Sequence, residues 1–212
     1  MRNQRRVTAL VVMAGAAIVA TGGLLASNMG FKLNYTLTKS GAGSKSGRQS
    51  IGLPYNRQVG IDKASHLLAD VTAGGVAALQ LEKFNMINDS NSPYPGVSDF
   101  DLEKGVGYLL RVNQSGPYII VGSHDPGYAV PLTKAGAGSK SGRNRYAHPY
   151  HGVSATASEL LAELSPDGLQ VERFNPSNDS NTPYPATDFA LVPGQAYLVR
   201  VVNNKSFIPD HY

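Results

Sequence analysis

An eight-residue segment, GAGSKSGR, occurs twice without change in this chain, at Gly41–Arg48 and at Gly136–Arg143. A longer match follows it, because Glu82–Pro95 (EKFNMINDSNSPYP) and Glu172–Pro185 (ERFNPSNDSNTPYP) share ten of their fourteen positions. The offset between the matched segments falls from 95 to 90 residues along the chain, as small loop deletions in the second copy would produce. The repeat therefore predicts a chain made of two homologous halves.

The boundaries of the halves follow from the matched segments. We predict repeat module 1 over residues 28–126 and repeat module 2 over residues 127–212. Each module is near the smallest size that supports a hydrophobic core of its own. No Ser/Pro-rich connector separates them, so we expect the halves to pack directly against each other, about a pseudo-twofold axis.

The first 27 residues have the pattern of a targeting segment. Arg2, Arg5 and Arg6 precede Val7–Ala26, a run without any charged residue. This pattern predicts a signal peptide or an uncleaved N-terminal anchor over residues 1–27. Either one implies an exported protein, located extracellularly, at the cell surface or in the periplasm. Contact with a membrane is expected only through this segment.

Composition narrows the possible partners and chemistry. Three of the 19 Lys and Arg residues lie in the targeting segment, which leaves 16 basic against 15 acidic side chains. This balance argues against a nucleic-acid-binding surface. The chain has no cysteine, which excludes disulfides, thiolate metal sites and a cysteine nucleophile. The 23 glycines and 13 prolines favour short strands joined by turns.

Hydrophobic periodicity predicts one short helix in each half. Apolar residues recur at helical spacing from Ala64 to Val71 and again from Ala157 to Leu164. Asp62 marks the start of the first helix, and a capping box of Thr156 and Glu159 starts the second. Strands are expected at 31–37, 50–53, 78–84, 106–113, 118–121, 169–174, 195–203 and 207–208.

These elements define the expected fold class. It is a β-rich α+β fold with two homologous tandem modules. Each module is predicted to be a small antiparallel sheet or sandwich, or a partly open barrel, with one short helix.

The repeated octapeptide superficially resembles a phosphate-binding loop. That motif needs a glycine directly before the lysine, but Ser44 precedes Lys45 and Ser139 precedes Lys140. A strand pattern, not a helix pattern, follows each copy. We therefore expect a solvated glycine-rich hairpin loop, and no cofactor.

The polar loops of the two long matched segments offer oxygen ligands. Asp89, Asn91, Asp179 and Asn181 are candidate calcium ligands, although each loop has only one carboxylate and lacks the later glutamate of an EF-hand. The alternative is an ordinary turn, since Asn, Asp, Ser and Pro favour turns. We predict no other metal site.

Two histidines recur in both halves. His124 and His211 occupy matched positions beside Asp125 and Asp210, which suggests a structural hydrogen bond or, as an alternative, a His–carboxylate pair for acid–base chemistry. His148 stands where the first half has Leu53, so a less buried strand is expected there.

The tyrosines are candidates for stacking on sugar rings. Tyr94 and Tyr184 lie beside the polar loops and are the candidate ligand-binding residues. The remaining matched tyrosines are expected to fill the cores; they are Tyr55, Tyr108, Tyr150 and Tyr197.

The order of motifs carries a family resemblance. The first half contains, in order, IGLPY, a Leu-Leu-Ala helix, EKF, a polar loop, DFDLEKGVGYLLRV and a closing histidine. The second half contains the matching series YAHPY, a Leu-Leu-Ala helix, ERF, a polar loop, DFALVPGQAYLVRV and a closing histidine. This order resembles the secreted tandem-repeat proteins of deltaproteobacteria, of Geobacter-like and myxobacterial type. It is more loosely similar to extracellular β modules with the pattern ISLP…PGxGYxV. The resemblance implies an exported, envelope or extracellular protein.

The expected function is that of an exported, non-enzymatic structural or surface module. It would act in self-assembly or in contact with other surface proteins, through turns and strand edges. The alternative is a module that binds surface polysaccharide. A third hypothesis is an envelope hydrolase that uses His124 or His211.

Overall fold

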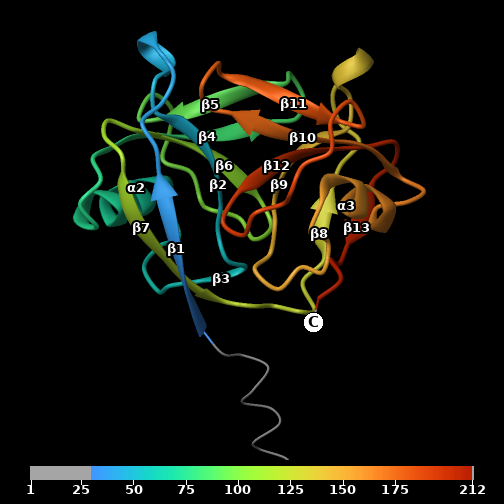
Figure 1. Cartoon of the computed structure of the whole chain (residues 1–212), viewed down its shortest axis with the longest axis horizontal. Helices are drawn as coiled ribbons and strands as arrows, with labels where there is room; N and C mark the ends of the chain where they lie inside the picture. The colour runs from blue at the N-terminus through green and yellow to red at the C-terminus, as the bar shows by residue number, and fades with distance from the viewer. Residues whose placement is uncertain (1–29, 212) are drawn as a thin grey trace, which may run out of the picture.

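The computed structural model describes residues 30–211, which form a β-rich fold of several small antiparallel sheets (Figure 1). The sheets remain open and do not close into a barrel. The predicted fold class, β-rich with one short helix in each half, is confirmed.

From residue 30 on, where the structure describes it, the first half contains seven strands and one α-helix. They are β1 (Gly30–Leu37), β2 (Arg48–Gly52), β3 (Asn56–Arg57), α2 (Ala64–Ala73), β4 (Ala78–Asn85), β5 (Ser90–Tyr94), β6 (Gly107–Val112) and β7 (Gly116–Ser123), with a short 3-10 helix η1 (Gly43–Lys45).

Up to residue 211, the last one described, the second half contains six strands and one α-helix. They are β8 (Val130–Leu132), β9 (Arg143–Ala147), α3 (Ala157–Glu163), β10 (Gly168–Asn175), β11 (Ser180–Tyr184), β12 (Ala196–Val201) and β13 (Lys205–Phe207), with a 3-10 helix η2 (Gly138–Lys140).

The main sheets of the two halves have the same strand order. One runs β2-β6-β4-β5 and the other β9-β12-β10-β11, and all neighbours are antiparallel. Their registers also agree, since Leu81 lies opposite Tyr94 and Val171 lies opposite Tyr184. Within residues 30–211, each ladder between named strands joins strands of one half. The two sheets lie side by side about an approximate twofold axis (Figure 1).

Strands β5 and β11 were missed by the sequence interpretation, which assigned their residues to polar turns. Both strands are edge strands, and each pairs along its whole length with one neighbour. Their polar sequences, SNSPY and SNTPY, have no alternation of apolar residues because little of either strand is buried.

Helix α3 has the predicted N-terminal cap, but helix α2 does not. The side chain of Thr156 accepts a hydrogen bond from the backbone of Glu159, so the capping box is confirmed. The expectation that Asp62 caps α2 is wrong: Lys63 is the N-cap residue, and Asp62 instead pairs with His66. Asp99 accepts a hydrogen bond from the first-turn Ser65 amide, so a distant carboxylate satisfies that helix end.

Two hydrophobic clusters form the core, one in each half. Tyr108 and Tyr197 are fully buried at matched positions, as predicted. Tyr55 belongs to the first half, but its side chain packs in the hydrophobic cluster of the second half. Tyr150 was expected in a core but is 37% exposed, because it stacks on Phe31 at the surface.

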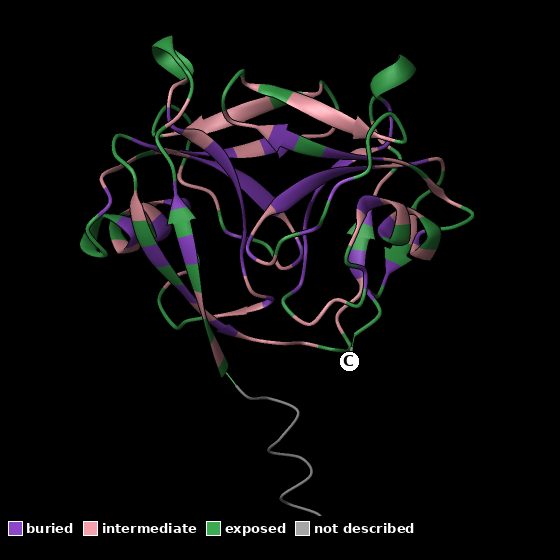
Figure 2. Ribbon diagram, in the orientation of Figure 1, coloured by how far each residue is buried: buried purple, intermediate pink, exposed green. Residues whose placement is uncertain are grey.

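The two halves meet through their central strands, which are the most buried part of the molecule (Figure 2). The amide of Gly52 donates to the carbonyl of Gly194 at 2.8 Å, and the amide of Ala147 donates to the carbonyl of Gly105 at 2.9 Å. The halves therefore pack directly against each other.

Two matched positions lie face to face at this junction. A Cβ atom on Gly107 would stand 2.1 Å from the Cβ of Ala196, its counterpart in the other half. Only one of these two positions has room for a methyl group. This explains why GYLLRV and AYLVRV differ at their first residue.

The prediction for the N-terminal segment lies outside the described residues. Among residues 30–211, no helix is long and apolar enough to cross a membrane.

The close approach at the junction gives a first prediction. Gly107→Ala should lower the free energy of unfolding by about 1–3 kcal/mol, because the added methyl group overpacks the junction. The double variant Gly107→Ala/Ala196→Gly exchanges the two side chains and should recover most of the loss, except for about 1 kcal/mol for a glycine within β12. Urea unfolding of both variants and of Ala196→Gly measures this, and additive losses in the double variant would contradict it.

Candidate functional site

Each octapeptide reaches across the junction to the polar loop of the other half. The ammonium of Lys45 lies 2.8 Å from a carboxylate oxygen of Asp179, and Arg48 binds the other oxygen at 2.5 Å. The matched contacts of Asp89 are 2.9 Å to Lys140 and 2.7 Å to Arg143. The two halves thus exchange the same pair of ionic contacts in both directions.

Glycine is required where the octapeptide meets the opposite loop. A Cβ on Gly41 would lie 2.7 Å from the carbonyl oxygen of Pro176, and one on Gly136 would lie 2.7 Å from that of Met86. Both glycines also have positive φ angles, +77° and +78°. The repeated segment is a loop with a short 3-10 helix, and the glycines and cations that recur in its two copies serve the contact between halves.

Two glutamates complete this ionic network. Arg48 binds Glu82 at 2.5 Å, and Arg143 binds Glu172 at 2.5 Å. Each arginine therefore bridges a glutamate of its own half and an aspartate of the other. The arginine and glutamate side chains are largely buried, so these pairs lie in a region of low dielectric.

Arg145 is a fifth cation beside this network, and it breaks the symmetry. The matched position in the first half is Ser50. Arg145 is 6% exposed, and its guanidinium lies 5.6 Å from the centre of the Phe84 ring. Its Nε and Nη1 atoms are buried and have no hydrogen-bond partner among the described residues. Burial lowers the pKa of the guanidinium to about 10, so the side chain is still charged at neutral pH.

A polar cavity of about 380 Å³ opens beside Arg145, between the two halves. Strands β4 and β5 contribute Gln80 and Asn91, and β11 contributes Asn181. The Oδ1 atom of Asn91 is buried without a partner among the described residues. The cavity thus combines an unpaired buried cation with amide groups that can both donate and accept hydrogen bonds.

The candidate calcium ligands are placed in this region, but their carboxylates are already engaged. Both oxygens of Asp89 accept from Arg143, and Asp179 is held by Arg48 and Lys45. Within residues 30–211, no group of three or more histidine or acidic side chains could hold a metal ion. In this structure Asp89 and Asp179 serve as ion-pair partners of the opposite half.

The candidate sugar-stacking residues Tyr94 and Tyr184 lie at the ends of β5 and β11. Both are half-buried and pack against the hydrophobic clusters of their halves. They are not exposed as a flat stacking surface, and their role in sugar binding stays a prediction.

The recurring histidines meet at the lower end of the junction. The His124 ring lies 4.9 Å from that of His211 and 5.2 Å from that of His151. Burial, followed by the nearby His211 and His151, lowers the pKa of His124. Asp125, the expected carboxylate partner, instead binds Lys104 at 2.8 Å. The sequence interpretation did not predict that His124 and His211 contact each other. Their matched positions were a possible signal, because equivalent residues of two symmetric halves can lie together at the twofold axis.

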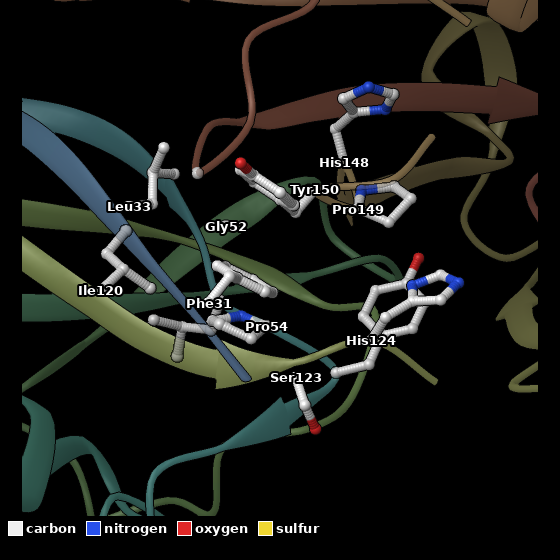
Figure 3. A pocket seen from close by; sticks show the side chains of 13 residues that line it. Phe31, Leu33, Gly52, Pro54, Ile120, Ser123, His124, His148, Pro149 and Tyr150 are labelled. Atoms are coloured by element: carbon white, nitrogen blue, oxygen red, sulfur yellow. The ribbon is translucent and has the colours of Figure 1, made fainter. Parts of the chain in front are cut away.

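An apolar pocket adjoins these histidines. Figure 3 shows Phe31, Tyr150, His124 and His148 around it. Its volume is about 20 Å³, which is room for about one water molecule. The pocket is therefore too small for an organic ligand in this conformation.

His148 is buried, contrary to the expectation of a less buried strand. It is 6% exposed; Gly152 lies against its ring, and the rings of Tyr146 and Tyr197 lie 6.2 and 6.4 Å from it. Burial lowers its pKa to about 4. The matched Leu53 is equally buried, so the position is a core position in both halves.

Comparisons with protein-family models, curated proteins and solved structures find no match to this chain. The resemblance to secreted tandem-repeat proteins therefore stays a prediction.

The reciprocal ion pairs give a second prediction. Asp179→Asn keeps a residue that tolerates the positive φ of 53° but removes the charge that Arg48 and Lys45 contact. We expect a loss of about 3 kcal/mol in the free energy of unfolding, because the buried Arg48 loses one of its two carboxylate partners. Asp101→Asn is the control, since this 79%-exposed carboxylate pairs with Lys63 at the surface. Its effect should stay within about 0.5 kcal/mol, and equal effects of both variants would contradict the prediction.

His148 gives a third prediction. Its pKa is about 4 in the folded protein against an ordinary 6.5. Between these values the unfolded chain binds a proton that the folded one does not, so stability is full above pH 6.5 and falls toward pH 4. Between pH 7 and pH 5 the burial of His148 should lower the free energy of unfolding by about 2 kcal/mol.

The variant that tests this replaces His148 with leucine, the residue of the first half. His148→Leu should fold and lose about 2 kcal/mol less than the parent protein between pH 7 and pH 5. Urea unfolding at the two pH values measures the difference. If the variant has the same pH dependence as the parent protein, the burial of His148 is not the cause of the loss of stability at low pH.

Proposed function

We propose that this protein is an exported, non-enzymatic surface module that contacts partner chains, including copies of itself, by strand addition at β1. The proposal rests on the open side of this strand. The export and surface location follow from the pattern of the first 27 residues.

Strand β1 lies at the end of its sheet, whose order is β1-β7-β3. It has eight residues and no proline, and one of its sides has no strand partner among the described residues. The other edge strands are less suitable. Strands β5 and β11 each contain a proline that removes a backbone donor. Strands β2 and β9 are largely buried, and β3, β8 and β13 have only two or three residues. An unprotected edge of this length is a template for strand addition.

A groove accompanies the open side of β1. It has a volume of about 350 Å³ and is lined by Leu33, Asn34 and Thr36 of β1 and by Phe174 and Val192 of the second half. An extended segment placed there would pair with the backbone of β1 and bury apolar side chains against the groove. This combination of backbone edge and side-chain groove supports the contact function.

The histidine geometry favours this function over hydrolysis. The expected His–carboxylate pair at His124 is not formed, because Asp125 binds Lys104. His211 approaches the carbonyl of Pro209 at 3.3 Å. Neither arrangement orients an imidazole by a carboxylate, as acid–base catalysis would use.

The second candidate function, polysaccharide binding, is favoured by a different observation. The central cavity carries amide groups and an unpaired arginine, which suit hydroxyl and carboxylate groups of a saccharide. This site differs from the tyrosines that the sequence indicated.

A fourth prediction tests strand addition at β1. Val192 is 42% exposed in the groove, and its matched residue in the first half is Glu103, so glutamate fits this backbone position. Val192→Glu should weaken self-association at least tenfold, because a charge would be buried beside an added strand. Sedimentation equilibrium of the purified protein measures the dissociation constant.

Val153→Glu is the matched control, because Val153 is also exposed but does not line the groove. It should leave association unchanged. A parent protein that stays monomeric at high concentration would contradict self-assembly, and equal effects of both variants would contradict the assignment to β1.

A further inference from the structure

One cation at the junction, Arg145, forms no ion pair, whereas the two lysines of the network are mostly exposed to solvent. The network contains five cations and four carboxylates; they are Lys45, Arg48, Lys140, Arg143 and Arg145, and Glu82, Asp89, Glu172 and Asp179. Each carboxylate already contacts an arginine of the symmetric pairs. Arg145 is only 6% exposed and forms no ion pair with a carboxylate, although Glu82 and Glu172 are near enough to interact with it electrostatically.

A buried charge without a counterion is costly, and proteins retain one rarely. The cost here is avoidable, since Ser50 occupies the matched position of the first half. The stacking of Arg145 on Phe84 satisfies the face of the guanidinium but not its N–H groups. An external anion would provide the missing partner.

The space for such an anion is the central cavity, which Arg145 lines. Its volume of about 380 Å³ is within the range of small-molecule sites, about 300–1,000 Å³. Gln80, Asn91 and Asn181 contribute amides to its lining, beside the carboxylates of Glu82 and Asp179, which are paired with Arg48 and Lys45. Arg48, whose Nε is buried without a partner among the described residues, also lines the cavity.

The lining indicates a ligand that has hydrogen-bonding groups as well as a negative charge. Amide groups both donate and accept, as a row of hydroxyl groups does, and Asn91 Oδ1 lacks a donor in this structure. A small inorganic anion would satisfy Arg145 and leave the amides unused. A saccharide with a carboxylate would satisfy both.

We propose that the cavity between the two main sheets is a binding site for an acidic saccharide, with its carboxylate against Arg145 and its hydroxyls on the amides of Asn91 and Asn181. The site does not depend on strand addition at β1. Among the described residues, Phe174 alone lines both the cavity and the β1 groove. Either proposal can therefore fail without the other.

The test is calorimetric titration of the purified full chain with trigalacturonate. Galactotriose has the same rings without the carboxylates, and inorganic sulfate is an anion without the hydroxyls. We expect trigalacturonate to bind at least tenfold more tightly than either of them. No binding of trigalacturonate, or equally tight binding of sulfate or galactotriose, would overturn the proposal.

The variants assign the site. Arg145→Ser places the residue of the first half at this position and should weaken trigalacturonate binding at least thirtyfold, whereas Arg145→Lys should retain part of the affinity. Lys134→Ser removes one charge from an exposed residue outside the cavity and should bind as the parent does.

A second variant covers the case in which Arg145→Ser does not fold. Asn91→Asp puts a carboxylate into the cavity and should weaken binding of trigalacturonate at least tenfold by repulsion. A folded Arg145→Ser or Asn91→Asp protein with the parent affinity would overturn the assignment of the site.

Discussion

The reciprocal exchange of ion pairs between the halves is the interaction on which this architecture depends. Each half extends an octapeptide whose lysine and arginine hold the aspartate of the opposite polar loop. Because the arginines also bind a glutamate of their own half, each arginine contact across the junction is tied to the main β-sheet of that half. The junction therefore encloses partly buried charges that must be matched, and this requirement sets the relative position of the sheets.

Symmetry is broken where the halves come closest together. Gly107 faces Ala196 because two methyl groups do not fit, His148 replaces Leu53 in a core position, and Arg145 replaces Ser50. The first difference is steric. The other two introduce titratable groups into buried sites, and Arg145 opens on a polar cavity. Positions of this kind can acquire a function in one half while the other half keeps the structural residue.

The sequence predicted the helices and most strands because they carry apolar periodicity, as Leu67 and Val71 of α2 do. The expected strands did not include β3, β5, β8, β9 or β11. The pairing of β5 and β11 comes from their neighbours and not from an apolar pattern of their own. The sequence also gave no indication of the central cavity. Tyr94 is partly engaged in a core, whereas Arg145, which lies at the cavity, looks in the sequence like an ordinary polar strand residue.

The amino-acid sequence alone determined the repeated pattern, the β-rich class with one helix in each half and the absence of cysteine chemistry, because these depend on local patterns and composition. Only the tertiary structure decided what the polar residues contact. Asp89 and Asp179, candidate calcium ligands by their spacing, became partners of arginines about fifty and more than a hundred residues away in the chain. Local spacing cannot specify such contacts, because a side chain's electrostatic partner depends on which distant segments the packing of the two halves brings within a few ångströms.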